Sequence, residues 1–228
     1  MSAISVTVLI SAYNEEGTIA DVFQQAYQEL EKLKADYEII LCDDASRDST
    51  KKIIAQLLDA CPRARAIYHQ HNQGMFKTFD ELYHAAGKEL VILFPGDGQW
   101  SPHILTQAIE AMAGCDVVVA ARLQKQYTLF RKINSWFFNE LVRVFFGVDL
   151  YDIGAVKLIR RSLLQGISVE TQGAFSEAER LLKAHKAGHK IGVIWVQHNE
   201  RRAGKAGGAR LKYILQALKD LIVFRFRY

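Results

Sequence analysis

The sequence predicts an α/β protein with a mostly parallel central β-sheet and helices on both faces. The first 121 residues alternate short apolar runs with longer amphipathic stretches, which is the order of βαβ units joined by right-handed crossovers. Half of the 228 residues are apolar and 24% are charged. This composition is typical of a globular chain with a sizeable core, and it excludes a disordered or collagen-like chain.

The elements of the first part follow from hydrophobic periodicity. The apolar runs are short and rich in β-branched residues, which is typical of buried strands, and the segments between them place apolar side chains about 3.6 residues apart, as in helices that cover a sheet. Strands are expected at 4–11, 37–42, 65–69, 90–94 and 116–121. Helices are expected at 15–34, 49–60, 74–86 and 102–112.

The second part of the chain has a different character. Its most distinctive segment, 129–146, is an amphipathic stretch rich in aromatic residues. Strands are expected at 154–159 and 190–196, and helices at 177–187 and 211–226. We expect one domain over residues 1–208, followed by an amphipathic basic helix over 209–228.

Charge is unevenly distributed, although the net charge is only +4. Residues 201–228 contain eight Lys or Arg and one Asp, a net +7, so residues 1–200 carry −3. A basic tail on an acidic body suggests a partner that carries phosphate groups. The tail has no recognisable nucleic-acid-binding motif, so a nucleic-acid partner is the weakest alternative.

The three cysteines favour a reduced, intracellular protein. Cys42, Cys61 and Cys115 are odd in number and form no CxxC pair, which argues against a disulfide framework and against a cysteine-based zinc site. We expect Cys42 in the core. No apolar run approaches the ~18 residues that span a bilayer, and the N-terminus lacks a signal-peptide pattern. The chain is therefore expected in the cytoplasm, soluble or associated with a membrane.

Three polar clusters follow predicted strands, at 11–16 (SAYNEE), 43–48 (DDASRD) and 95–99 (PGDGQ). The carboxyl ends of parallel strands meet at one edge of a sheet, so the clusters are expected to converge. Each has a simpler explanation as a helix cap or turn. Together they predict a nucleotide pocket, in which one carboxylate contacts the nucleoside and another holds Mg²⁺ or Mn²⁺ near the phosphates. Neither GxGxxG nor a P-loop is present.

The order SAYNEE, DDASRDST and PGDGQ resembles the family 2 glycosyltransferases of the GT-A type, whose pattern is PxYNE, DDGSxDxT and DxDxQ. Later segments resemble the subgroup that contains dolichol-phosphate mannose synthase and other polyprenyl-phosphate glycosyltransferases. The segments that carry this resemblance are Arg122, RKINS with Arg131 and Ser135, Asp152, GAVKLIRR, ERLLKAHKAG with Glu179, and the region of Arg201, Gly204 and Lys205.

The resemblance implies a GT-A fold and transfer of a sugar, with inversion, from a GDP- or UDP-sugar to a polyprenyl or dolichyl phosphate. It implies Asp97, Arg131 and Arg201 as catalytic residues and Asp97 with Gln99 as ligands of a divalent Mg²⁺ or Mn²⁺. The residues implied to bind substrate are Ala12, Tyr13, Asn14, Glu15, Asp43, Asp44, Gly96, Gln99, Arg122, Ser135 and Lys205.

Three positions depart from the family pattern. Pro95 replaces the first Asp of DxD, which leaves one carboxylate and an amide to hold a metal. Lys157 stands where the family often has Arg, which keeps the charge but loses the bidentate fork. Ala206 replaces a serine and removes a hydroxyl. These changes suggest altered donor specificity or weak activity.

Two segments suggest contact with a membrane surface. Residues 129–146 and 211–226 combine apolar stripes with Lys and Arg, as helices that lie in a membrane interface do. Each stripe taken alone is better explained by packing on the sheet, and it is the two together that suggest membrane contact. Peripheral membrane association and a membrane-protein partner are both compatible with this pattern.

Two other functions stay open. The same fold would act on a saccharide hydroxyl if a base such as Glu179 were available, because a hydroxyl acceptor needs one and a phosphate does not. Pro95 also prompts a nucleotide-sugar-binding protein without catalysis. We expect Glu177 on a helix surface, and His69, His71 and His198 as surface or internally satisfied histidines.

Overall fold

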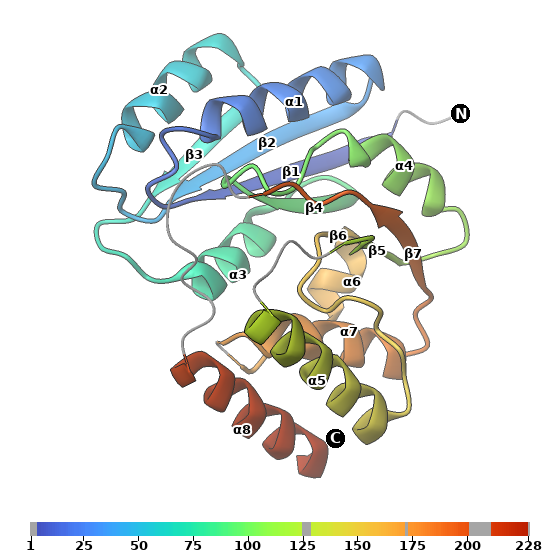
Figure 1. The fold of residues 1–228 in the computed structure, drawn as a ribbon. Helices are drawn as coiled ribbons and strands as arrows, with labels where there is room; N and C mark the ends of the chain where they lie inside the picture. The colour runs from blue at the N-terminus through green and yellow to red at the C-terminus, as the bar shows by residue number, and fades with distance from the viewer. Residues whose placement is uncertain (1–3, 125–128, 172, 201–210, 228) are drawn as a thin grey trace.

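The computed structural model describes residues 4–124, 129–171, 173–200 and 211–227, with the side chains of 129–131 and 211–214 excluded. In these residues a seven-stranded sheet has the order β3-β2-β1-β4-β6-β5-β7 (Figure 1). The strands are β1 (Ser5–Ala12), β2 (Asp36–Asp43), β3 (Ala64–Tyr68), β4 (Leu90–Pro95), β5 (Val117–Arg122), β6 (Lys157–Arg160) and β7 (Ile191–Val196). All the strands expected from the sequence are present.

The sheet is mostly parallel, as predicted, and β6 is its exception. β6 runs antiparallel to both neighbours, β4 and β5. The other pairs, β1 with β2 and β4, β2 with β3, and β5 with β7, are parallel. The sequence does not give the direction of β6, because one short apolar run looks alike in either orientation.

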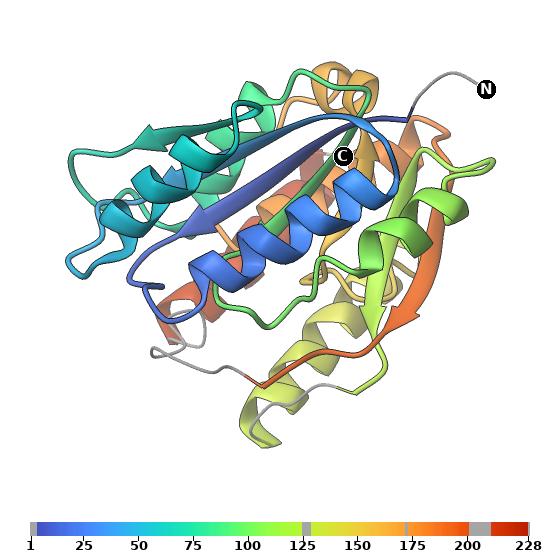
Figure 2. The ribbon, with the colours of Figure 1, turned by 90° about the horizontal axis from the view of Figure 1, so that it is seen from above.

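Helices cover both faces of the sheet, which confirms the predicted layers (Figure 1). One face carries α1, α2 and α4, with α1 and α4 side by side in Figure 2. His103, just before α4, bonds to Glu29 of α1 at 2.9 Å. The other face carries α3, α6 and α7. The bounds are α1 (Ile19–Lys32), α2 (Thr50–Ala60), α3 (Met75–Ala85), α4 (Ile104–Ala111), α6 (Arg161–Gly166) and α7 (Ser176–Lys186); the short α6 was not expected.

Two further helices, α5 (Leu129–Phe146) and α8 (Leu211–Arg227), lie next to each other below α7 in Figure 1. The Phe224 ring of α8 contacts Phe175 at 5.4 Å and Phe146 at 5.6 Å between ring centroids. Leu221 and Ala217 are also buried. The C-terminal helix therefore packs one side, which carries Ala217, Leu221 and Phe224, against the body of the protein, while Leu215 and Ile222 are exposed. No helix in the described ranges is long and apolar enough to cross a membrane.

The core lies under the central strands. The Val6, Val8, Leu9 and Ile10 side chains of β1 are fully buried, as expected for a strand covered on both faces. Cys42 is buried as predicted, and all three cysteines are free thiols. The packed sheet gives its carboxyl-end loops a rigid base.

Candidate functional site

The three polar clusters converge at the carboxyl end of β1, as the sequence predicts. The β1 carbonyls of Ala12 and Ser11 accept hydrogen bonds from the backbone N–H of Asp44 at 2.9 Å and of Gly96 at 2.7 Å. The Thr18 hydroxyl donates to the Gly96 carbonyl at 2.7 Å. Segments far apart in the sequence are thus joined directly at one edge of the sheet.

The loops after β1 and β2 are interlocked. The Ser46 hydroxyl accepts from the Asn14 N–H at 2.9 Å, and the Asn14 side chain accepts from the Arg47 N–H at 2.8 Å. Asn14 and Ala45 both adopt positive φ, at 56° and 59°. Such backbone conformations are uncommon for residues with a Cβ and persist where surrounding contacts hold them. Tyr13 projects from this loop, partly exposed to solvent.

The carboxylate of Asp44 is used inside the protein. It accepts from Nδ1 of His69 at 2.7 Å and from the N–H groups of Gln73 at 2.7 Å and Gly74 at 2.9 Å. Nε2 of His69 contacts Glu81 at 2.8 Å. His69 is therefore internally satisfied, one of the two situations expected for it. Asp44 fixes the loop that leads into α3.

The carboxylates around His69 raise the pKa of its imidazole. Burial alone lowers the pKa of this imidazole, but the hydrogen bonds and negative charges of Asp44 and Glu81 outweigh burial, so the pKa lies above the ordinary 6.5. The neighbouring Asp43 is buried and accepts from the Ser46 N–H at 3.2 Å. Of the two adjacent carboxylates, Asp43 has fewer internal partners among the described contacts.

Asp97 sits in a tight turn after β4. Its carboxylate accepts from the Gln99 N–H at 3.0 Å, and Gly98 in between has a φ of 68°. Gly96 is closely surrounded, because an added Cβ would lie 2.9 Å from the Ser11 carbonyl oxygen. Pro95 offers no side-chain ligand. Within the described residues no group of three or more His, Cys, Asp or Glu side chains is arranged to hold a metal ion.

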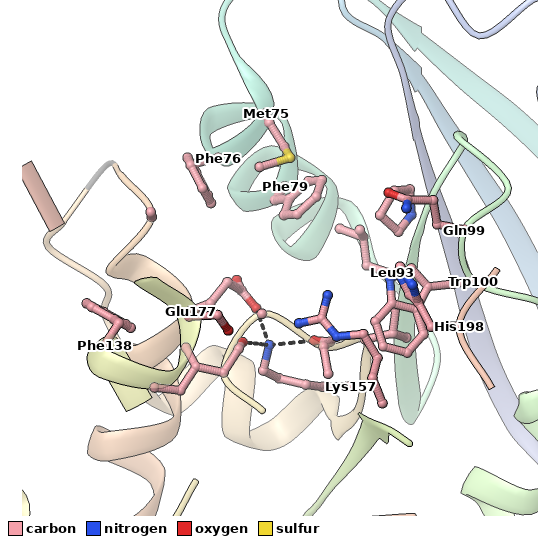
Figure 3. A pocket seen from close by; sticks show the side chains of 18 of the residues that line it. Met75, Phe76, Phe79, Leu93, Gln99, Trp100, Phe138, Lys157, Glu177 and His198 are labelled. Carbon is pink, nitrogen blue, oxygen red and sulfur yellow. Dashed lines mark hydrogen bonds and ion pairs between the residues drawn. The ribbon is translucent and has the colours of Figure 1, made fainter. Parts of the chain in front are cut away.

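Asp97 and Gln99 open onto a pocket of about 340 Å³. Its lining comes from α3, β4, β5, α5, β6, α7 and α8, together with loops that include those after β4 and β7. Figure 3 shows aromatic and methionine side chains on one side, and Gln99, Trp100 and His198 on another. The apolar side consists of Met75, Phe76 and Phe79 from α3 and Phe138 from α5. The pocket is therefore amphipathic.

Arg122 lines this pocket but is held by Asp152. Its Nε and Nη2 donate to the two carboxylate oxygens at 2.6 and 2.7 Å, a bidentate pair that is buried on both sides. The guanidinium also lies over the Trp100 ring at 5.4 Å, and Trp100 meets His198 edge to face at 5.2 Å. Asp152 thus neutralises the charge of Arg122, which the sequence analysis assigned to substrate. His198 is buried in the pocket wall.

Lys157 and Glu177 form a buried ion pair in the pocket lining, at 2.8 Å (Figure 3). The Lys157 ammonium also donates to the Ile153 and Ala155 carbonyls at 2.9 Å each, so its three N–H donors are all used. Glu177 is therefore not a helix-surface residue, and that expectation was wrong. The sequence missed it because helical periodicity does not show which face of α7 the sheet covers.

The charge of Glu177 is stabilised in place. Burial alone raises the pKa of this carboxyl. The charges of Lys157 and Arg180 and the Lys157 hydrogen bond lower the pKa by more than burial raises it, so the pKa lies below 4.5. Arg180 packs over the Tyr83 ring at 4.5 Å. The pocket floor therefore carries a compensated ion pair.

Glu179 points away from the pocket into a separate network. Its side chain is 0% exposed and accepts from Lys183 at 2.8 Å, from the Thr171 hydroxyl at 2.6 Å and from the N–H groups of Glu170 and Thr171. Burial raises its pKa, but these hydrogen bonds lower it overall. Glu179 holds the segment before α7 and is not among the pocket-lining residues.

Several predicted site residues lie outside the described part. Arg201 and Lys205 are not described, and of Arg131 only the helical backbone in α5 is. Ser135 lines the pocket. The Asn199 N–H bonds to the Gln99 carbonyl at 2.9 Å, so the last residues described before 201 lie beside the Asp97 turn.

The aromatic wall of the pocket is not evident from the sequence. Met75, Phe76 and Phe79 lie on a helix whose moderate amphipathicity is explained equally well by packing on the sheet. The available signal was three large apolar residues in the first two turns after Gly74, one of them, Met75, left exposed. Only the position of α3 opposite α5 reveals that they line a pocket.

Comparison with known proteins gives one family. The sequence profile described as glycosyl transferase family 2 matches residues 7–168. The undecaprenyl-phosphate 4-deoxy-4-formamido-L-arabinose transferase of Aeromonas hydrophila is 26% identical over 222 residues, covering 95% of this chain and 66% of the relative. The enzyme of the same name from Pectobacterium atrosepticum is 27% identical, with 96% and 66% covered. The chain spans just under two thirds of the length of these relatives.

Solved structures share the fold. Glucosyl-3-phosphoglycerate synthase from Mycobacterium tuberculosis, in complex with Mn²⁺, UDP and glucosyl-3-phosphoglycerate, aligns with a TM-score of 0.74 at 16% identity, covering 97% of this chain and 80% of that chain. A mannosyltransferase from Pyrobaculum calidifontis, in complex with GDP-Man and Mn²⁺, aligns with a TM-score of 0.70 at 17% identity, covering 100% and 66%.

Proposed function

The chain belongs to glycosyl transferase family 2 and has the GT-A fold, and on that premise we propose that it transfers a sugar from a nucleotide-diphosphate donor to a polyprenyl phosphate. The observation that carries the proposal is the convergence of the loops at 12–16, 43–48 and 95–99 beside one amphipathic pocket. The names of the relatives support a polyprenyl-phosphate acceptor.

The donor nucleoside would lie against the loop Ala12, Tyr13, Asn14 and Glu15, next to Asp43. Tyr13 is partly exposed there and offers a ring for stacking. Asp44 would act by holding the neighbouring loop, because its carboxylate already has three partners. The pyrophosphate would lie at Gly96, Asp97 and Gln99, where the absence of a Cβ on Gly96 lets this turn pack closely against Ser11 and Ile19.

A divalent ion fits this site only together with the donor. Mg²⁺ and Mn²⁺ prefer oxygen ligands and usually complete their shell with substrate phosphates and water. Asp97 and Gln99 would supply the protein's share, and Pro95 supplies none. When bound, the ion neutralises charge on the pyrophosphate leaving group.

The acceptor phosphate needs no strong general base, because it is already anionic at pH 7. One of its oxygens attacks the anomeric carbon as the bond from that carbon to the pyrophosphate oxygen breaks, and a nucleoside diphosphate leaves with inversion. Arg131, Ser135, Arg201 and Lys205 are the proposed acceptor-phosphate contacts, and positive charge there offsets the approach of two anions. The burial of Glu179 disfavours the alternative saccharide acceptor.

The exposed faces of α5 and α8 support a lipid-bilayer surface as the docking partner. Trp136 is 65% exposed on α5 and Phe226 is 87% exposed on α8. We call the exposed apolar residues of these helices the α5–α8 surface; they are Ile133, Trp136, Phe137, Val144, Leu215, Ile222, Val223 and Phe226. Exposed Lys132, Arg143, Lys219, Arg225 and Arg227 lie on the same helices. Aromatic residues with basic neighbours suit the interface of an anionic membrane.

A transfer assay tests the proposed function. Labelled nucleotide sugars are offered with a polyprenyl phosphate, the matching polyprenol and a soluble saccharide as acceptors. We expect label in the lipid phase with the polyprenyl phosphate alone. Transfer to the saccharide would favour the second enzyme function, and donor binding without transfer to any acceptor would favour a binding protein.

A further inference from the structure

The pocket beside Asp97 has two chemically different sides. Gln99, Asn134, Ser135 and His198 are among its polar residues, whereas Met75, Phe76 and Phe79 form an apolar wall on α3 and Phe138 lines the pocket from α5 (Figure 3). Phe76 and Phe79 pack edge to face, with centroids 6.3 Å apart. We call Met75, Phe76 and Phe79 the α3 wall.

The position of the pocket decides which part of the substrate enters it. On the proposed function, the donor pyrophosphate lies at Asp97 and Gln99, which are themselves part of the lining. The sugar is bonded directly to that pyrophosphate, so the sugar is the first group beyond it. The volume of about 340 Å³ suits one substituted monosaccharide and is far too small for a long polyprenyl chain. On the proposed function, the polyprenyl chain of the acceptor would instead lie along the exposed α5–α8 surface.

Among the described lining residues, the two basic side chains are already engaged by other groups of the protein. Lys157 uses its three donors on Glu177 and two carbonyls, and its side chain is 1% exposed. The Arg122 charge is compensated by the bidentate pair with Asp152. An ionic group on the sugar would therefore lie against apolar side chains and ion pairs that are already compensated, and it would lose its hydration at a high cost in free energy.

A fully hydroxylated sugar is also a poor match for the α3 wall. A hydroxyl placed against Phe76 and Phe79 would lose its hydrogen bonds to water without a replacement. A deoxy position, a methyl group or the methyl of an acetamido group would instead bury apolar surface there. The polar side of the pocket, which includes Asn134, would lie nearest the other hydroxyls.

We propose that the α3 wall selects donors whose sugar carries a deoxy or N-acyl group, and that this group packs against Phe76 and Phe79. The proposal rests on the proposed function, and it adds the chemical class of the sugar. One methylene in an apolar pocket changes discrimination by roughly 10–200-fold, so a selective wall is expected to give at least about a tenfold preference.

The test is donor binding to the full chain by calorimetry, with a panel matched in the nucleotide. Each set contains a fully hydroxylated sugar and forms of it with a single deoxy or N-acyl group at C2, C4 or C6, such as UDP-glucose and UDP-N-acetylglucosamine. We expect at least one substituted sugar to bind about tenfold more tightly than its parent. Parents that bind as tightly as every substituted form would overturn the inference.

Variants separate the wall from the rest of the protein. Phe76→Ser is expected to reduce the ratio of affinities for substituted and parent sugars about fivefold or more, whereas Trp195→Ser, an exposed aromatic on β7 outside the pocket, keeps the wild-type ratio. An equal loss for both sugars in Phe76→Ser would contradict the inference. If Phe76→Ser does not fold, Met75→Gln at the more exposed end of the wall replaces it.

Failure of the inference and failure of the proposed function give different results. If the parent sugars are preferred and are still transferred to polyprenyl phosphate, only the assignment of the α3 wall fails. If no donor in the panel yields a glycosylated polyprenyl phosphate, the proposed function fails, whatever the binding preference is.

Discussion

Lys157 of β6 and Glu177 of α7 form an ion pair at 2.8 Å, with the Lys157 side chain 1% exposed. The pair joins the one antiparallel strand of the described sheet to the helix beneath it and forms part of the pocket floor. Two charges so deep in a protein are tolerated because each compensates the other and Lys157 also satisfies two carbonyls.

Removing either partner is expected to destabilise the fold strongly. Lys157→Met or Glu177→Met alone should lower the free energy of unfolding by about 3–5 kcal/mol, because each leaves a buried charge without its partner. The double variant should regain most of that loss, since two apolar side chains can replace a buried pair. Urea denaturation of the four proteins measures the coupling. Additive losses in the double variant would show that the pair is not coupled.

Stability should depend on pH through His69. Its pKa is raised above 6.5 in the folded state, so the stabilising charge is fully present below about pH 6.5. That contribution is lost as the pH rises through the folded-state pKa. Urea unfolding between pH 6 and 9 should show declining stability in the wild type and a flatter profile in His69→Asn. Equal slopes for the two proteins would contradict this role.

Metal binding should require the nucleotide. Since the described residues form no cluster of three metal-ligating side chains, Mn²⁺ alone should leave the melting temperature unchanged. Mn²⁺ with a nucleoside diphosphate should raise it above the value for the nucleotide alone. Asp97→Ala should remove this extra increase and abolish transfer. A full increase in Asp97→Ala would remove Asp97 from the metal site.

Gly96 should not tolerate a larger side chain. An added Cβ would lie 2.9 Å from the Ser11 carbonyl and 3.1 Å from Ile19 Cδ1, inside the junction of the converging loops. Gly96→Ala should therefore cost about 1–3 kcal/mol of stability and weaken donor binding. Gly166→Ala is the matched control, because its Cβ would meet nothing within 4 Å. Equal behaviour of the two variants in urea unfolding and donor calorimetry would refute the prediction.

The α5–α8 surface should bind anionic membranes. The measurement is co-sedimentation with vesicles that contain roughly 30 mol% phosphatidylglycerol. Trp136→Ser should weaken binding to these vesicles about tenfold, because burying one aromatic side chain contributes roughly 1.5–3 kcal/mol. Trp195→Ser, which changes an exposed tryptophan on β7, should bind like the wild type. Equal binding by all three proteins would exclude this surface. Binding restored only by a membrane-protein extract would identify a protein partner instead.

The sequence by itself determined the sheet, the helices that cover it and the three polar clusters. Hydrophobic periodicity is a local property, and the burial of β1 and the amphipathicity of α1 follow from it directly. The convergence of the clusters also followed, because parallel strands place their carboxyl ends at one edge. The family resemblance rested on the same local segments and is confirmed for family and fold.

Only the tertiary structure decided what those residues contact. Asp44 turns inward to His69, Arg122 pairs with Asp152, and Glu177 lies in the pocket rather than on a surface. The α3 wall and the direction of β6 were equally invisible beforehand. The physical reason is that ion pairs and cavities form where elements far apart in the sequence pack against each other. A local sequence pattern shows which side of a helix or strand is apolar, but it does not show which element packs against that side.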